Sequence, residues 1–234
     1  MLNEKNKQYW QKYKPGEIPS PSNEPSLKLL KETKGNILDV GTGDGILAEK
    51  LAEKGFQVFG IDIAENIICE NKKRDTTVEY SVQDITKKTN FPNNYFALIL
   101  FKYTLTNIHK EAWEFLGEEI FRILKPNGKV WIFEPLVSEM YRERYRLSNY
   151  FVEDKNCVYV VSSETKTRVE KIKTRNDLEK AIKEDKVIRI IKHYTEEELS
   201  LIFSKLRLFQ KRRVQTISPS GFKLNTFEGI FLKE

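Results

Sequence analysis

Residues 36–45 read NILDVGTGDG, a short run of mostly apolar residues that leads directly into a glycine-rich turn. The apolar run is typical of a buried strand, and the residues that follow, ILAEKLAEK at 46–54, have helical spacing. A glycine turn between a strand and a helix lets the backbone approach a ligand closely and directs amide groups of the helix start toward it. The stretch therefore predicts a binding site at the end of a strand.

Strand and helix patterns alternate on the carboxyl-terminal side of this turn. Four more apolar runs are typical of strands, namely FQVFGID (56–62), VEYSVQD (78–84), YFALILF (95–101) and KVWIFEP (129–135). Helical patterns separate them, most clearly AENIICENKK (64–73) and EAWEFLGEEIFRIL (111–124). This alternation predicts an α/β fold with a mostly parallel sheet covered by helices on both faces.

Residues 136–192 interrupt the alternation. Within them, residues 140–151 are typical of a helix, and residues 158–163 and 167–173 of a hairpin about SETK. We interpret 136–192 as an inserted substrate-recognition lid within a single domain of residues 1–234.

The core pattern resumes after the insertion. TEEELSLIFSKL (195–206) predicts a helix that starts with a capping box of Thr195 and Glu198, and residues 208–217 and 227–233 predict the closing strands. At the other end of the chain, residues 1–34 read as a helical cap and a proline-rich connector, after which Ser26 is expected to cap a short helix that ends at Gly35.

Composition excludes several classes of protein. Hydrophobic residues make up 39% of the 234 and charged residues 32%, with 14 Phe and 10 Tyr, which is too apolar for disorder throughout. The longest apolar run, residues 96–101, is too short to span a membrane, and the polar start lacks a signal-peptide core, so we expect a cytoplasmic protein. Cys69 and Cys157 fit neither a disulfide framework nor a zinc cluster, and we expect no metal.

The net charge of +6 is unevenly distributed. Residues 1–140 carry 19 Lys and Arg against 20 Asp and Glu, whereas residues 141–234 carry 21 against 14. A basic segment can indicate an acidic or nucleic-acid partner, but acids alternate with the bases here, and solvated basic side chains explain the surplus more simply. For Lys211, Arg212 and Arg213 we expect a solvated strand edge.

A second acidic position narrows the ligand class. Asp62 ends the second strand pattern, 21 residues after Gly41, which suits a bidentate grip on ribose hydroxyls. A dinucleotide fingerprint would need a further glycine three residues after Gly43, where Ile46 stands. The spacing predicts a ligand that carries a nucleoside but is not a dinucleotide.

At this point the chain resembles the class I S-adenosylmethionine-dependent methyltransferases, within the type 11 group of ubiquinone and menaquinone biosynthesis. The motifs that carry the resemblance are ILDVGTGDG (37–45), VFGID (58–62), VQDI (82–85), EEIFRILKPNGKVWIFEP (118–135) and KHYTEEEL (192–199). They occur in the family's order and cover well over half of the chain. The resemblance implies a Rossmann-like seven-stranded sheet, parallel except for the last strand, with the lid inserted between the fifth and sixth strands.

The resemblance also implies that S-adenosylmethionine is the cofactor and S-adenosylhomocysteine the product. The cofactor-binding residues that it implies are Asp39, Gly41, Thr42, Gly43, Gly45, Asp62, Ile63, Asp84, Ile85, Phe101 and Tyr13. Among them, Asp62 would bind the ribose hydroxyls, Asp84 would accept from the adenine amino group, and Phe101 would follow the fourth strand near the methionine end.

The residues that act on the acceptor are less sharply marked. Transfer from a sulfonium is a displacement with a good leaving group, so positioning supplies most of the rate and a base is needed only where the nucleophile must lose a proton. His193 is the candidate base, although a capping or core role fits it as well, and His109 reads as a surface residue. Tyr141, Tyr145 and Tyr150 are candidates for an acceptor pocket or for the small core of the insertion.

Three functions follow from these features. The first is methylation of a small-molecule acceptor, which the lid-sized insertion favours. The second is methylation of tRNA or another RNA by the same fold, which the basic carboxyl-terminal segment would favour. The third is a non-catalytic module that binds S-adenosylmethionine. The sequence leaves open the acceptor atom (oxygen, nitrogen or carbon) and the oligomeric state.

Overall fold

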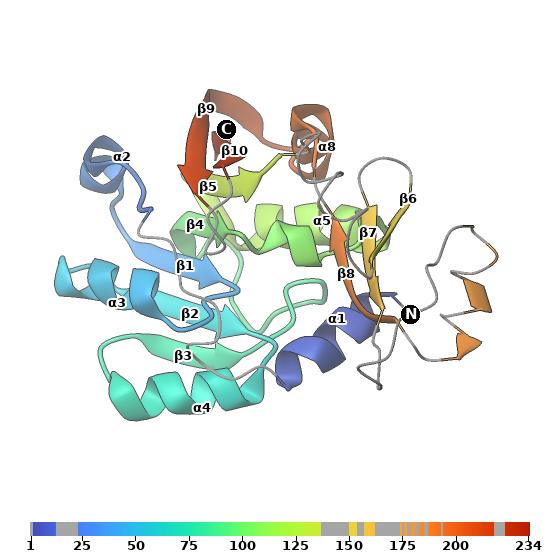
Figure 1. The fold of residues 1–234 in the computed structure, drawn as a ribbon. Coiled ribbons are helices and arrows are strands. Elements are labelled where there is room, and N and C mark those ends of the chain that lie inside the picture. Colours follow the sequence, from blue (N-terminus) through green and yellow to red (C-terminus); the bar gives the residue numbers. More distant parts are fainter. Residues whose placement is uncertain are drawn as a thin grey trace.

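A computed structural model describes most of the chain. The described residues are 2–12, 23–136, 150–153, 157–161, 174, 176, 179–180, 183–184, 187–192, 194–217 and 223–234. Their elements form a seven-stranded main sheet with helices on both faces and a separate three-stranded sheet at one end (Figure 1).

The main sheet has the strand order β3-β2-β1-β4-β5-β10-β9. Its strands are β1 (Asn36–Val40), β2 (Val58–Asp62), β3 (Glu79–Val82), β4 (Phe96–Lys102), β5 (Leu124–Pro135), β9 (Arg207–Ile217) and β10 (Lys223–Leu232). The strands β1 to β5 pair in parallel, and β10 runs antiparallel to both β5 and β9. The predicted α/β class, the strand count and the single antiparallel strand at the chain's end are all confirmed.

Two apolar layers hold the helices on the sheet. Alternate strand residues point to opposite faces, so Ile37 belongs to one core cluster and its neighbour Leu38 to the other. The helices are α2 (Leu27–Glu32), α3 (Ile46–Glu53) and α4 (Glu65–Arg74) on the Ile37 side, and α5 (Trp113–Ile123) and α8 (Glu196–Ile202) on the Leu38 side. In α5, for example, Leu116, Ile120 and Ile123 are buried along one stripe.

Helix starts follow the predicted capping signals. The Ser26 hydroxyl accepts the Leu29 amide at 3.2 Å, and α8 begins with the predicted capping box, in which Thr195 accepts from the Glu198 amide and Glu198 from the Thr195 amide. These local signals involve side chains within three residues of each other, which is why the sequence shows them.

The insertion folds differently from the prediction. Its described strands β6 (Tyr150–Glu153), β7 (Cys157–Val161) and β8 (Val187–Lys192) form an antiparallel sheet in the order β6-β7-β8. Tyr150 and Phe151, which we predict as the end of a helix, are strand residues that pair with β7. β7 therefore pairs with β6 and β8, whereas its predicted partner, 167–173, lies outside the described residues. Helical spacing was a poor guide here because ladder pairing with β7, whose partner residues lie only eight and ten positions further along the chain, decided the conformation.

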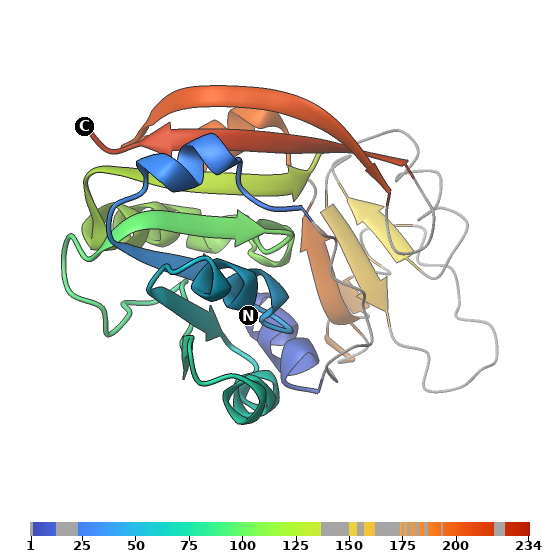
Figure 2. The same cartoon turned by 90° about the vertical axis from the view of Figure 1, so that its left-hand side faces the viewer.

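The small sheet stands at the end of the main sheet toward which its parallel strands point (Figure 2). Helix α1 (Leu2–Gln11) packs against β8. Its Asn6 is buried and donates from Nδ2 to the carbonyl oxygen of Asn107, at 2.6 Å, in the segment that follows β4. The amino-terminal helix and the insertion thus meet beside the carboxyl ends of the central strands. Within the described part of the chain, no helix combines the length and apolar character needed to cross a bilayer.

Candidate functional site

The glycine loop, residues 41–45, follows β1, at the point where the strand order reverses between its two neighbours β2 and β4. This is the usual ligand position in open parallel sheets. The amides of Gly41 and Thr42 both donate to the Ile61 carbonyl oxygen, at 2.8 and 3.0 Å, so β2 holds the loop at its start. Gly43 has φ of +52°, and a Cβ added there would have nothing within 4 Å. The loop thus presents open backbone at Gly43.

The Asp62 side chain fastens the loop to the end of β2. Its Oδ2 accepts the Gly43 amide at 3.1 Å, and its Oδ1 accepts the Ala64 amide at 3.0 Å. Burial raises the pKa of this carboxyl, and the two amide bonds oppose the rise. The carboxylate is half-buried and keeps lone pairs for further donors, which suits a group placed to accept from hydroxyls.

Asp39, in β1, holds the start of the loop through Thr42. It is 3% exposed, and its Oδ2 accepts from the Thr42 hydroxyl at 2.8 Å. Burial raises its pKa from 3.8 to about 6, while the Thr42 bond and the charge of Lys102 pull it down. The contact shows Asp39 as a brace for the turn between β1 and α3.

The segment after β3 lies beside Asp62. The Gln83 amide donates to the Asp62 carbonyl oxygen at 3.0 Å, which brings Asp84 next to the end of β2. The Asp84 carboxylate closes a local turn, in which Oδ1 accepts the Thr86 amide at 3.0 Å and the Thr86 hydroxyl at 2.6 Å. Ile85 is buried in the core, and Ile63 is half-exposed.

A buried glutamate that the sequence did not single out holds the segment that follows β4. Glu134 is the next-to-last residue of β5 and has no exposed surface, and its Oε1 accepts the amides of Thr104 and Leu105, at 2.5 and 2.7 Å. Burial raises its pKa from 4.5 to about 8 against the pull of these amides. Its Oε2 is buried without a hydrogen-bond partner among the described residues. The available signal was one carboxylate at the end of the apolar strand pattern KVWIFEP.

Thr104 links the segment after β4 to the glycine loop. Its hydroxyl donates to the Val40 carbonyl oxygen at 2.8 Å, and a Cβ on Gly41 would lie 2.5 Å from its Cγ2. Gly41 therefore lets the segment after β4 lie directly against the loop. On the other side of this segment, the buried Tyr194 hydroxyl lies 2.7 and 2.8 Å from the carbonyl oxygens of Leu105 and Ile108. The segment is thus held from β1, from β5 and from the residues that follow the insertion.

Two predicted positions need correction. Phe101 lies within β4 rather than after it, and its fully buried ring packs on Phe203 with centroids 5.8 Å apart, because strand alternation turns it into the core. Tyr103 and Thr104 are the residues that follow the strand. His109 is 6% exposed instead of on the surface, and it directly precedes the short helix Lys110–Ala112 at the start of α5. Its Nδ1 lies 3.8 Å from Glu111 Oε2.

Several candidates fall outside what the structure describes. Tyr13, Tyr141, Tyr145 and His193 are not among the described residues. Tyr150 is described only as a residue of β6. Among the residues that are described, no three His, Cys, Asp or Glu side chains gather as ligands for a metal ion.

The basic residues of β9 lie on an edge strand, as predicted, and carboxylates pair with them. Glu196 forms ion pairs with both Lys211, at 2.8 Å, and Arg213, at 2.6 Å, and Arg212 forms an ion pair with Glu228. These pairs offset the positive charge of the strand.

Comparison with known proteins agrees with the geometry. Residues 38–132 match the type 11 family of methyltransferase domains. Demethylmenaquinone methyltransferase of Chlorobaculum tepidum is 29% identical over 111 residues, which are 47% of this chain and 45% of that protein. Phosphoethanolamine N-methyltransferase 1 of Arabidopsis thaliana is 37% identical over 101 residues, 41% of this chain and 20% of that protein. The chain thus spans about half or less of these curated relatives.

A solved structure extends the similarity of fold to nearly the whole chain. A SAM-dependent methyltransferase from Methanosarcina mazei superposes with a TM-score of 0.71 over 90% of this chain and 99% of that one, at 21% identity. At this identity the match shows the fold alone, and it includes residues beyond the matched domain.

Proposed function

We propose that the chain, whose residues 38–132 match the type 11 family of methyltransferase domains, is an S-adenosylmethionine-dependent methyltransferase acting on a small-molecule acceptor. The observation that carries the proposal is the Asp62 carboxylate fastened to the Gly43 amide at the point where the strand order reverses. S-adenosylmethionine supplies an activated methyl group that a nucleophile takes by in-line displacement.

The site fits such a donor. The open backbone at Gly43 leaves room for a ligand against the loop, where a side chain would otherwise stand. The half-buried Asp62 would accept hydrogen bonds from the ribose hydroxyls. Asp84 and Ile63, which follow the ends of the neighbouring strands β3 and β2, would contact the adenine ring. Asp39, Thr42 and Gly45 would hold the loop in shape.

This chain's residues contribute mainly by positioning. Glu134 and Tyr194 fix the segment after β4 from two sides, and a fixed wall beside the donor lowers the entropic cost of aligning the reactants. Since a displacement from a sulfonium needs a base only when the nucleophile holds a proton, His193 is proposed as that base for such acceptors.

Residues 136–192 are proposed as the lid over the acceptor, and residues 1–34 as a second cap. Their support is the position of the small sheet and of α1 beside the carboxyl ends of the central strands (Figure 2). Tyr141, Tyr145 and Tyr150 belong to this lid and are the proposed acceptor contacts. The relatives' names include a menaquinone precursor and a phosphoethanolamine, so both ring-bearing and amine acceptors belong in a first screen.

Calorimetry with S-adenosylhomocysteine tests the proposal. We expect one site per chain with a Kd in the micromolar range, about −8 kcal/mol, and methyl transfer from S-adenosylmethionine to at least one quinone-like or amine acceptor. Absence of binding to the folded wild-type protein would overturn the methyltransferase assignment. Binding without an acceptor in a broad screen would favour the non-catalytic module instead.

A further inference from the structure

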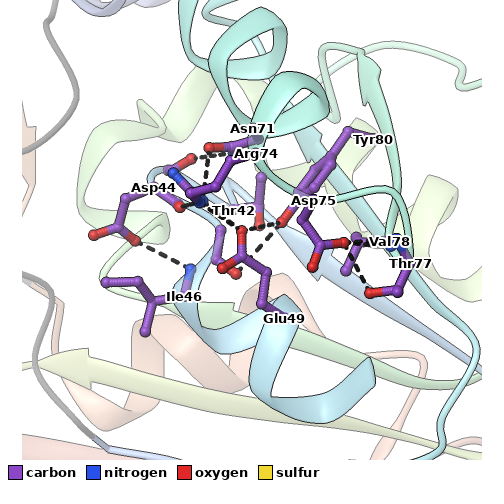
Figure 3. A network of polar contacts seen from close by, with 12 residues as sticks. Thr42, Asp44, Ile46, Glu49, Asn71, Arg74, Asp75, Thr77, Val78 and Tyr80 are labelled. Carbon is purple, nitrogen blue, oxygen red and sulfur yellow. Dashed lines mark hydrogen bonds and ion pairs between the residues drawn. The ribbon is translucent and has the colours of Figure 1, made fainter. Parts of the chain in front are cut away.

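A polar clamp holds the glycine loop from the side of helices α3 and α4. We define the clamp as Asn71 and Arg74 of α4 together with Glu49 of α3 (Figure 3). Its donors reach two consecutive loop carbonyl groups, since Asn71 Nδ2 donates to the Gly43 oxygen at 2.8 Å and Arg74 Nη2 donates to the Asp44 oxygen. The carbonyl and the amide of Gly43 are thus held by different side chains, Asn71 and Asp62.

Arg74 also orients the other members of the clamp. Its Nη2 donates to Asn71 Oδ1 at 3.2 Å, which leaves the Asn71 amino group facing the Gly43 carbonyl. Its Nε donates to Glu49 Oε1 at 3.0 Å, and Nη2 reaches the same oxygen. Because Glu49 neutralises the guanidinium, the positive charge can lie beside the loop without repelling a cationic ligand such as a sulfonium.

Tyr80 fills the space beneath the clamp. Its ring fits there because two neighbours lack side chains: a Cβ on Gly60 would lie 2.7 Å from ring carbons, and a Cβ on Gly45 would overlap the hydroxyl. The hydroxyl lies 3.3 Å from Glu49 Oε1 and 3.5 Å from the Gly45 oxygen, which is long for a hydrogen bond. Tyr80 therefore supports the loop by packing, and Arg74 and Asn71 supply the directional contacts.

We propose that Arg74 is a positioning residue for the donor: through Asn71 and the two carbonyl groups it presets the glycine loop in the shape that binds S-adenosylmethionine. This inference rests on the proposed function. Arg74 needs no contact with the ligand to act, because an ordered loop spares the cost of ordering it on binding. Its loss should raise Kd and KM for the donor and leave the chemical step nearly unchanged.

The test compares three variants at helix α4. Arg74→Met keeps the length of the side chain but loses every donor, Arg74→Lys keeps the charge opposite Glu49, and Lys73→Met removes a neighbouring cation whose ion pair with Glu70 is exposed. The Arg74 side chain is 46% exposed, so we expect Arg74→Met to fold, which a melting curve checks.

For Arg74→Met we expect a Kd for S-adenosylhomocysteine raised roughly tenfold, the equivalent of one charge-assisted hydrogen bond. We also expect kcat within about twofold of wild type at saturating donor, and faster amide exchange in peptides covering residues 41–46 of the ligand-free protein. Arg74→Lys should recover part of the affinity, and Lys73→Met should change none of these quantities.

Unchanged exchange in residues 41–46 of Arg74→Met, or an equal loss of affinity in Lys73→Met, would overturn the inference. Should the wild-type protein bind no S-adenosylhomocysteine, the proposed function fails. The exchange comparison in the ligand-free protein still decides whether Arg74 orders the loop.

Discussion

The Oδ2 atom of Asp62 accepts the backbone amide of Gly43 at 3.1 Å, so the last residue of β2 and the glycine loop after β1 form one unit across 19 positions of sequence. A carboxylate that holds a loop amide keeps further lone pairs for a ligand. Asp62 would therefore both shape the loop and bind the donor, and its variants should separate these two roles.

Asp62→Ala removes both roles, and we expect it to weaken S-adenosylhomocysteine binding at least roughly thirtyfold, since hydrogen bonds to a charged group contribute about 1.5–3 kcal/mol. Asp62→Asn keeps one acceptor oxygen and should lose less. Calorimetry measures both, with Glu53→Ala as an exposed control at the end of the neighbouring helix α3. Equal affinity of Asp62→Ala and wild type would exclude Asp62 from the donor site.

Gly43→Ala and Gly45→Ala should differ in kind. At Gly43 an added methyl meets no protein atom, so we expect a stability loss of about 1 kcal/mol from the positive φ alone, with a larger loss of donor affinity. At Gly45 the methyl overlaps Tyr80, so overpacking should add about 1–3 kcal/mol to the loss of stability. Urea unfolding measures both costs. The extra cost at Gly45 should shrink in a Tyr80→Leu background, and its persistence there would contradict the packing account.

Glu134→Gln should flatten the dependence of stability on pH. The folded-state pKa of Glu134, about 8, lies above the ordinary 4.5, so its contribution to stability is present at low pH and is lost as pH rises toward and through about 8. Glutamine keeps an oxygen for the Thr104 and Leu105 amides and does not ionise. The variant should therefore gain stability relative to wild type between pH 6 and pH 9. Parallel melting curves at the two pH values, with the same difference at each, would contradict this ionisation.

Bulk tRNA should bind weakly. The basic side chains Lys211, Arg212 and Arg213 of β9 lie in ion pairs with Glu196 and Glu228. These pairs leave little net positive charge on that strand to attract phosphates. At physiological salt we expect no mobility shift at tRNA concentrations below about 1 μM, the tight end of non-specific binding. A tight shift that steepens as salt falls, and that neutralising Lys211, Arg212 and Arg213 removes, would instead support an RNA substrate.

The sequence by itself determined the fold class and the position of the glycine loop at the end of the first strand. The glycine loop, its strand and its helix are contiguous, and Asp62 ends the next strand, so a fixed spacing places them at one edge of a parallel sheet. The caps at Ser26 and Thr195 are equally visible because their partners lie three residues away. Patterns of this kind depend on the local backbone, which hydrophobic periodicity reports directly.

Only the tertiary structure decided what surrounds that loop. Glu134 meets Leu105 across 29 residues, Arg74 meets Asp44 across 30, and Tyr194 meets Leu105 across 89. In the sequence, Glu134 is simply a carboxylate near the end of an apolar strand, Arg74 is one of several basic residues at the end of a helix, and Tyr194 is an aromatic residue after a strand. Each of them has many possible partners. The same holds for β7, whose ladder is with β6 and β8. Long-range partners follow from how the packed layers close, because most buried polar groups take their hydrogen-bond partners from whichever elements the fold brings beside them.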